Sequence, residues 1–241
     1  MRYQFALLLS LALSPAIGNS AEPGTLRLDD GSEVRTLSAG PEDSIEAILM
    51  VHDWFGFSPF LSGSADRLAA TGRQVLAVDL YEGKSATTHH EAWQLLQALD
   101  ADAAAAKIDA ALASLEAERI AIIGFSMGAP HALNAAIRNS GSVVTAVVFY
   151  GATINDPGEL AKMSGPVLAI YGSKDGPAAD NAATFSKAAD EAGIGAEIFV
   201  YPGAHHAFAQ PLFNQGETYD PEATSVMWLI TEDFLRRRLG S

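Results

Sequence analysis

The chain has 241 residues, of which 49% are hydrophobic and 18% charged, and its formal net charge is −14. This composition excludes an intrinsically disordered chain, and the length favours a single domain. The absence of cysteine excludes disulfides and thiolate metal sites, and the acidic balance argues against nucleic acid or anionic lipid surfaces as partners.

The first 20 residues resemble a secretory signal peptide. Arg2 precedes an apolar run over residues 5–13, and small residues follow up to the predicted cleavage near Ser20 or Ala21. An N-terminal membrane anchor is the alternative, but the run is shorter than the roughly 20 residues that a span needs. We therefore expect an exported protein, periplasmic or extracellular, without stable membrane association after cleavage. Removal of Arg2 brings its net charge to −15, from 14 basic and 29 acidic residues.

Regular secondary structure is expected over the rest of the chain. Segments 25–29 and 33–38 flank Asp30-Gly31 and predict an antiparallel hairpin closed by a type I′ turn. Apolar runs typical of strands buried on both faces follow at 45–51, 74–78, 120–123, 143–149, 167–171 and 196–201. Helical segments separate or follow them at 60–70, 91–98, 101–116, 129–138, 178–192 and 221–239. This alternation predicts a doubly wound, mostly parallel α/β sheet with the antiparallel hairpin at its N-terminal end.

The last predicted helix carries an apolar stripe. Val226, Leu229, Ile230 and Phe234 recur at helical spacing, and we expect them to pack on the sheet. The three arginines at 236–238 fall in the last turn, where cations offset the helix dipole.

Functional groups of an open α/β sheet lie at the carboxyl ends of its strands. The strand at 120–123 runs directly into Gly124-Phe125-Ser126-Met127-Gly128, which is followed by a helix. This is the pattern of a nucleophile elbow, in which the glycines permit a sharp turn and the serine hydroxyl is exposed. The N–H groups at the start of the helix favour developing negative charge. Ser126 is therefore the candidate nucleophile.

A serine nucleophile needs a base and a carboxylate that orients the base. In proteins with such an elbow, the serine comes first in the sequence, the carboxylate residue second and the histidine third. Asp175 follows the strand at 167–171, although it could instead cap the next helix, with Asp180 as the substitute acid. His205 and His206 follow the strand at 196–201. Spacing does not distinguish the two histidines, so both are candidate bases.

The loop after the strand at 45–51 offers a second group of candidates. The backbone N–H of Trp54, with that of Met127, could form an oxyanion hole, in which each donor is worth about 3–4 kcal/mol of transition-state stabilisation. Trp54, Phe55 and Phe57 would supply apolar pocket walls, or else belong to the core.

Together these segments resemble the dienelactone hydrolase family over residues 25–239. The segments that carry the resemblance are the elbow, His52-Asp53-Trp54-Phe55-Gly56, Ala77-Val78-Asp79-Leu80-Tyr81, Gly172-Ser173-Lys174-Asp175 and Ala204-His205-His206-Ala207-Phe208. The resemblance implies an α/β-hydrolase fold with a catalytic triad of Ser126, Asp175 and His206. The family's base directly precedes a small residue and phenylalanine, which selects His206 over His205. The family's oxyanion donors fall on Trp54 and Met127.

The sequence departs from the family pattern at the nucleophile and in the substrate pocket. The usual cysteine is Ser126, and the usual glutamate before the oxyanion residue is Asp53. The arginine expected two residues after Phe208 is Gln210, and only Lys84 stands near the place of a second one. We expect a pocket formed by Asp53, Phe55, Phe57, Tyr81, Lys84, His205 and Gln210, and a substrate other than the family's namesake.

The sequence therefore predicts a serine esterase that cleaves small carboxylic esters or lactones through an acyl-enzyme. The same groups could attack a thioester, a peptide or an organophosphate triester, and an inactive binding module is a further alternative. The presence of all three triad residues argues against the inactive module. No metal or organic cofactor is implied. The expected partner is a small-molecule ester, and the sequence indicates no oligomeric state.

Overall fold

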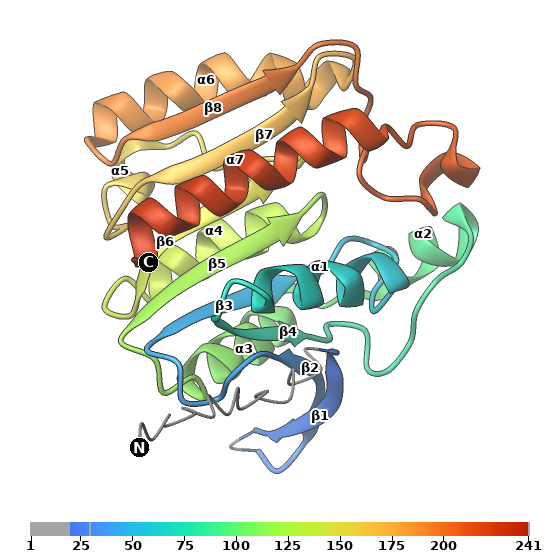
Figure 1. Ribbon diagram of the computed structural model, residues 1–241, viewed down its shortest axis with the longest axis vertical. Coiled ribbons are helices and arrows are strands. Elements are labelled where there is room, and N and C mark those ends of the chain that lie inside the picture. The colour runs from blue at the N-terminus through green and yellow to red at the C-terminus, as the bar shows by residue number, and fades with distance from the viewer. Residues whose placement is uncertain (1–19, 29, 241) are drawn as a thin grey trace, which may run out of the picture.

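The computed structural model describes residues 20–28 and 30–240, which fold around a mixed sheet (Figure 1). Its eight strands lie in the order β1-β2-β4-β3-β5-β6-β7-β8. β1 pairs antiparallel with β2 and β2 antiparallel with β4, and all other pairs are parallel. The strands are β1 Glu22–Arg27, β2 Glu33–Ala39, β3 Glu46–Val51, β4 Gln74–Val78, β5 Arg119–Phe125, β6 Val143–Phe149, β7 Val167–Gly172 and β8 Ala196–Tyr201. The predicted doubly wound α/β fold is confirmed.

Helices cover both faces of the sheet. α1 (Pro59–Ala69) and α7 (Pro221–Leu239) lie on the face toward the viewer in Figure 1, and α3 (Ala101–Ala113), α4 (Gly128–Arg138) and α6 (Gly176–Ala192) lie behind. α2 (His89–Ala98) lies apart, beyond the arrowheads of the strands. The sequence did not predict α5 (Pro157–Leu160) or the 3₁₀ helix η1 (Phe213–Gly216), because both are single turns without an apolar period.

The central strands are apolar throughout because they are covered on both sides. In β3, Ile48 and Met50 belong to the cluster under α1 and α7, whereas Leu49 and Val51 belong to the cluster under α3 and α4. Side-chain caps start the helices: the Ser58 hydroxyl, for example, accepts from the N–H of Leu61 at the start of α1. The local sequence and the layered packing therefore specify the same elements.

The N-terminal hairpin forms as predicted, but its turn lies one residue earlier. The N–H of Gly31 donates to the carbonyl of Leu28 at 2.9 Å, and Gly31 has φ 85°. Gly31 thus ends the turn, whereas the predicted type I′ turn would place it at the centre. The predicted signal peptide, apart from Ser20, lies outside the described residues. Within the described part, no helix combines the length and apolar character needed to cross a bilayer.

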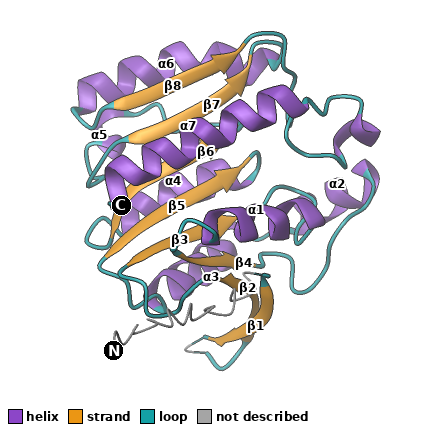
Figure 2. Cartoon of the chain, viewed as in Figure 1, coloured by secondary structure: helices purple, strands orange, loops and turns teal. Residues whose placement is uncertain are grey.

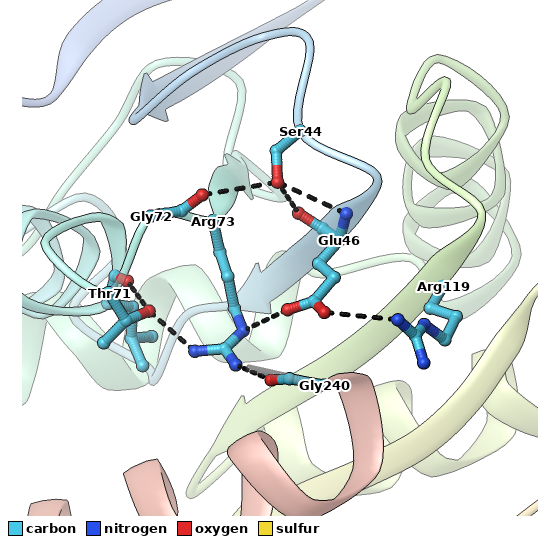
Figure 3. A network of polar contacts seen from close by, with 8 residues as sticks. Ser44, Glu46, Thr71, Gly72, Arg73, Arg119 and Gly240 are labelled. Carbon is cyan, nitrogen blue, oxygen red and sulfur yellow. Dashed lines mark hydrogen bonds and ion pairs between the residues drawn. The ribbon is translucent and has the colours of Figure 1, made fainter.

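A network of polar contacts joins the amino ends of three strands to the end of the chain (Figure 3). The buried Arg73, just before β4, donates to Glu46 of β3 at 2.9 Å and to the Thr71 hydroxyl at 2.8 Å. Its third contact, at 2.7 Å, is to the carbonyl of Gly240 just after α7. Arg119 of β5 lies 3.4 Å from the same Glu46 carboxylate. We call these five residues the amino-end network.

Beyond the carboxyl ends of the strands lies α2 (Figure 2), and a third, small hydrophobic cluster forms there. Phe55, Ala86 and Ala92 are buried in it, and Trp54, Leu95, Leu212 and Phe213 pack around them. We call α2, η1 and the residues from 210 to 220 around η1 the cap. In α2 only Ala92 is buried, and the cap contacts the two main cores through Leu95 and Phe213.

Candidate active site

Ser126 lies at a sharp turn between β5 and α4. Its φ is 48°, in the left-handed region that side chains avoid. Its N–H donates to the carbonyl of Phe149 at 2.9 Å, which ties the turn to the end of β6. A Cβ on Gly124 would lie 2.5 Å from the carbonyl oxygen of Gly128, and one on Gly128 would lie 2.5 Å from that of Val51. The glycines are therefore required sterically, as the nucleophile-elbow motif predicts.

The structure brings Ser126, His206 and Asp175 into one hydrogen-bonded chain. The Ser126 hydroxyl oxygen lies 2.9 Å from His206 Nε2, and His206 Nδ1 lies 2.8 Å from an Asp175 carboxylate oxygen. A carboxylate accepts only, so Nδ1 carries the proton and Nε2 accepts from the serine hydroxyl. Asp175 follows β7 and is buried, whereas His205 points outward and is exposed. Of the two candidate bases, His206 is the one placed against Ser126.

The two predicted oxyanion donors lie in turns at neighbouring strand ends. Among the described residues, neither the N–H of Trp54 nor that of Met127 donates a hydrogen bond. The turn before Trp54 is held by the buried ring of His52, whose Nδ1 lies 2.5 Å from the carbonyl of Asp53. Its Nε2 accepts from the N–H of Leu80 at 3.1 Å, so Nδ1 is the donor. Both candidate N–H groups are thus available to a ligand.

Asp53 and Gln210 form a buried pair behind this turn. One Asp53 oxygen accepts from the N–H of Phe55 at 2.8 Å and the other from Gln210 Nε2 at 2.6 Å. Burial raises the pKa of the Asp53 carboxyl to about 6, although both hydrogen bonds favour the ionised form. Gln210 is fully buried, with its amide oxygen accepting from Leu212. The prediction that Gln210 lines the substrate pocket is therefore wrong: its amide satisfies a buried carboxylate.

The other predicted pocket residues lie away from the cavity beside Ser126. Phe55 is fully buried in the cap cluster, which corrects the prediction for that residue. Tyr81 is nearly buried, and its hydroxyl lies 3.1 Å from the sulfur of Met127. The remaining three predicted pocket residues are partly or fully exposed and do not line that cavity: Phe57, Lys84 and His205.

The cavity beside Ser126 and His206 has a volume of about 520 Å³. Besides the triad, it is lined by Met127, Pro130, Tyr150, Gly151, Ala152, Thr153, Ala178 and Asn181. Most of these lie on the loop after β6 and on α6, which carry no catalytic motif, so no sequence pattern predicted them. The one available signal was Tyr150-Gly151, which directly follows a buried strand. A Cβ on Gly151 would lie 2.4 Å from the carbonyl oxygen of Ser126, so glycine allows this loop to close on the elbow.

Tyr150 stands out within this lining. It has φ 39°, and its ring lies 5.6 Å from that of His206 in a T-shaped arrangement. Its buried hydroxyl has no hydrogen-bond partner among the described residues. Burial, with a smaller effect of the Asp53 charge, raises the pKa of Tyr150 well above its usual value. The hydroxyl therefore stays protonated.

The cap covers His206 from another side. The ring of Phe213 lies 5.2 Å from that of His206, and Trp54 and His89 pack on Phe213 at 5.9 and 4.8 Å. The N–H of Asn214 donates to His89 Nε2 at 2.7 Å, which ties η1 to α2. Within the described part of the chain, no three histidine, aspartate or glutamate side chains gather as a metal site would require.

Known proteins share this arrangement of elements. A model of the dienelactone hydrolase family matches residues 34–239. A protein of Saccharolobus solfataricus, provisionally named a carboxymethylenebutenolidase, is 26% identical over a 251-residue alignment that covers 86% of this chain and 95% of that protein. The solved structure of a dienelactone hydrolase-like promiscuous phosphotriesterase from metagenomic libraries has a TM-score of 0.76 at 20% identity, covering 92% of this chain and 100% of the other. The solved structure of a dienelactone hydrolase from Anabaena variabilis has a TM-score of 0.70 at 19% identity, and the match covers 91% of this chain and 99% of the other. These similarities extend over nearly the whole described fold.

Proposed function

The chain belongs to the dienelactone hydrolase family, and from this premise we propose that it is a serine hydrolase of small carboxylic esters or lactones. In this proposal Ser126 is the nucleophile, His206 the general base and acid, and Asp175 the carboxylate that orients His206. One observation carries the assignment: the unbroken chain of hydrogen bonds from Ser126 through His206 to Asp175. It begins at a strained turn, which supports a functional role, because strain of this kind collects at active sites.

The reaction would proceed through an acyl-enzyme. His206 Nε2 accepts the Ser126 proton as the serine oxygen attacks the ester carbonyl, and the N–H groups of Trp54 and Met127 stabilise the oxyanion. His206 then protonates the leaving alcohol. A water molecule attacks the acyl group in the second half, and His206 again accepts and returns the proton.

The same nucleophile can attack phosphorus as well as carbon. A relative in fold is described as a promiscuous phosphotriesterase, so a triester belongs among the substrates to be tested.

The test is covalent labelling followed by kinetics. A fluorophosphonate probe should label the wild-type protein and His205→Ala, and it should fail to label Ser126→Ala. A panel of 4-nitrophenyl esters of graded acyl length, with one lactone and one phosphotriester, then defines the preferred electrophile. Equal labelling of Ser126→Ala, or no turnover of any ester or lactone by the folded wild type, would overturn the proposal.

We further propose that the protein is exported, with residues 1–20 as its signal peptide. The motif at the N-terminus supports this. Intact mass measurement after expression in a Gram-negative host should give a species that begins near Ala21 in the periplasm or the medium. A full-length cytoplasmic product would contradict it.

A further inference from the structure

We propose that the cavity beside Ser126 binds a neutral oxygen-bearing part of the substrate, an ether, hydroxyl or carbonyl group, through the side-chain amide of Asn181. This inference rests on the proposed function, because the cavity is the space next to the nucleophile. It names the chemical class of the group that lies there while the ester carbonyl is attacked.

The lining combines apolar and polar groups. Met127, Pro130, Ala152 and Ala178 offer small apolar surfaces, whereas Thr153 and Asn181 add hydrogen-bonding groups. The lining includes no lysine or arginine, and its buried carboxylate, Asp175, is already paired with His206. A cavity of this composition accepts a neutral group that is partly apolar and partly polar. A substrate carboxylate would meet no lysine or arginine there.

The polar groups form a closed ring with Asn155 on the loop after β6. Asn155 and Asn181 are joined through their amides at 2.5 Å, and Asn181 and the Thr153 hydroxyl are joined at 2.5 Å. The Thr153 hydroxyl lies 3.2 Å from the Asn155 amide oxygen, which closes the ring. The ring fixes the Asn181 amide before any substrate arrives, so little side-chain entropy is lost on binding.

A count of hydrogen-bonding groups shows what the ring can still bind. An asparagine amide has two N–H donors and one oxygen. In either direction around the ring, Asn181 uses one N–H and accepts one bond on its oxygen. One N–H of Asn181 therefore has no acceptor among the described residues. An unsatisfied donor that loses water on substrate binding is costly unless the substrate supplies an oxygen. The geometry thus favours a substrate with an acceptor at that position.

The experiment compares ethers with hydrocarbons of equal length. On the acyl side, the 4-nitrophenyl esters of methoxyacetic, 3-methoxypropanoic and 4-methoxybutanoic acids are paired with butanoate, pentanoate and hexanoate. On the alcohol side, the acetate of 2-methoxyethanol is paired with butyl acetate. Each kcat/KM is divided by the rate constant for alkaline hydrolysis, which removes the intrinsic reactivity of the ether esters. We expect an ether preference of about three- to tenfold at one length in one series, the value of one neutral hydrogen bond.

Three variants locate the cause of the preference. Asn181→Leu, of similar size, should remove the ether preference, because it should lower kcat/KM for the ether esters more than for the hydrocarbon esters. Thr184→Val, one turn further along α6 and exposed, should retain the preference. Asn181→Asp replaces the donor by acceptors, so it should lose the ether preference and gain turnover of esters that carry a trimethylammonium group. It also serves as the second test if Asn181→Leu fails to fold.

The outcomes separate this inference from the proposed function. If the wild type hydrolyses esters but shows no ether preference in either series, the inference is wrong and the proposed function stands. The inference is also wrong if the preference survives in both Asn181→Leu and Asn181→Asp. If no ester is hydrolysed at all, the proposed function itself has failed.

Discussion

The two ends of the parallel strands differ in how their polar groups are satisfied. At the amino ends, the buried Arg73 and Glu46 are paired with each other and with further polar groups (Figure 3). At the carboxyl ends, Ser126 and Tyr150 have positive φ, the Tyr150 hydroxyl has no partner among the described residues, and Asp53 is a buried carboxyl with a raised pKa. The charged groups of the amino edge are paired, although the buried side-chain oxygen of Gln74 in β4 has no partner among the described residues, whereas the carboxyl edge holds strained and unpaired groups where chemistry is expected. The two edges should therefore respond to mutation in opposite ways.

The largest effect is expected at the carboxyl edge and on activity alone. Ser126→Ala and His206→Ala should each lower kcat at least about 10³-fold, because triad members act as a unit. Urea unfolding of Ser126→Ala should show stability within about 1 kcal/mol of wild type, since the change leaves no large cavity. His205→Ala is the matched control and should retain most of the activity. If His205→Ala were the more damaging change in a folded protein, the assignment of the base would be wrong.

The opposite result is expected for the amino-end network. Arg73→Met leaves the Glu46 carboxylate largely buried, with only the longer contact to Arg119, and should lower the free energy of unfolding by about 3 kcal/mol. The kcat/KM of the remaining folded protein should not change, because the network lies at the opposite ends of the strands. Arg236→Ala, which breaks an exposed pair with Asp233, is the control and should cost less than about 1 kcal/mol. A loss of kcat/KM in folded Arg73→Met would show that the two edges are coupled.

The buried Asp53 carboxyl at the carboxyl edge should make the folded protein less stable as the pH rises. Its folded-state pKa of about 6 lies above the ordinary value of 3.8 because burial disfavours the charge, so the folded protein binds this proton more tightly than the unfolded chain. The free energy of unfolding therefore falls as the pH rises from about 4 to about 6, and the loss persists above that range. Asp53→Asn should recover about 1–3 kcal/mol at pH 7.5 and almost nothing at pH 4.

Urea unfolding of wild type and Asp53→Asn at both pH values measures this difference. The new amide oxygen can accept from Gln210 Nε2 as the carboxylate does, so the variant should still fold. Equal stability of the two proteins at pH 7.5 would mean that Asp53 is not destabilising when ionised.

The smallest effect concerns the charge of the substrate. A neutral aryl ester should have a kcat/KM about tenfold higher than the same ester with a terminal carboxylate, because Gln210 is buried against Asp53 and cannot bind the anion. Lys84 is exposed and lies outside the lining of the cavity, and Lys84→Ala tests whether it contributes to binding of the anion. A tenfold preference for the carboxylate ester at physiological salt would contradict the prediction, and Lys84→Ala should then abolish that preference.

Local patterns in the sequence sufficed to predict much of the fold and to identify Ser126 and Asp175 as candidates, whereas the choice of His206 over His205 came from the family resemblance. The continuous apolar runs correspond to the central strands because burial on both faces leaves no room for polar residues. The elbow at Ser126 was recognisable because its glycines are enforced by contacts within a few residues or with the adjacent strand. These constraints fall on five consecutive residues, so the motif can be recognised directly in the sequence.

Long-range pairings leave no such trace. Gln210 and Asp53 are 157 positions apart, and a lone glutamine does not reveal that it satisfies a buried carboxylate. The apolar stripe predicted on α7 was also partly wrong, since Leu229 is 62% exposed while Met227 and Trp228 are buried. Apolar residues occur on more than one side of α7, so periodicity alone did not identify the face that packs on the sheet. The residues that line the cavity lie mostly on a loop and a helix that carry no motif, so they could not be predicted either.

The separate packing of the cap has a consequence for how this scaffold can change over evolutionary time. Phe213 lies beside His206 and Trp54 packs on Phe213; both belong to the small cluster, and Phe213 also contacts the core under α1 and α7. Substitutions or insertions there alter which molecules reach the serine without disturbing the layers that hold the fold together. The elements that hold Ser126, His206 and Asp175 and the elements that surround them are thus different parts of one chain. The substrate range could therefore change during evolution while the sheet stays constant.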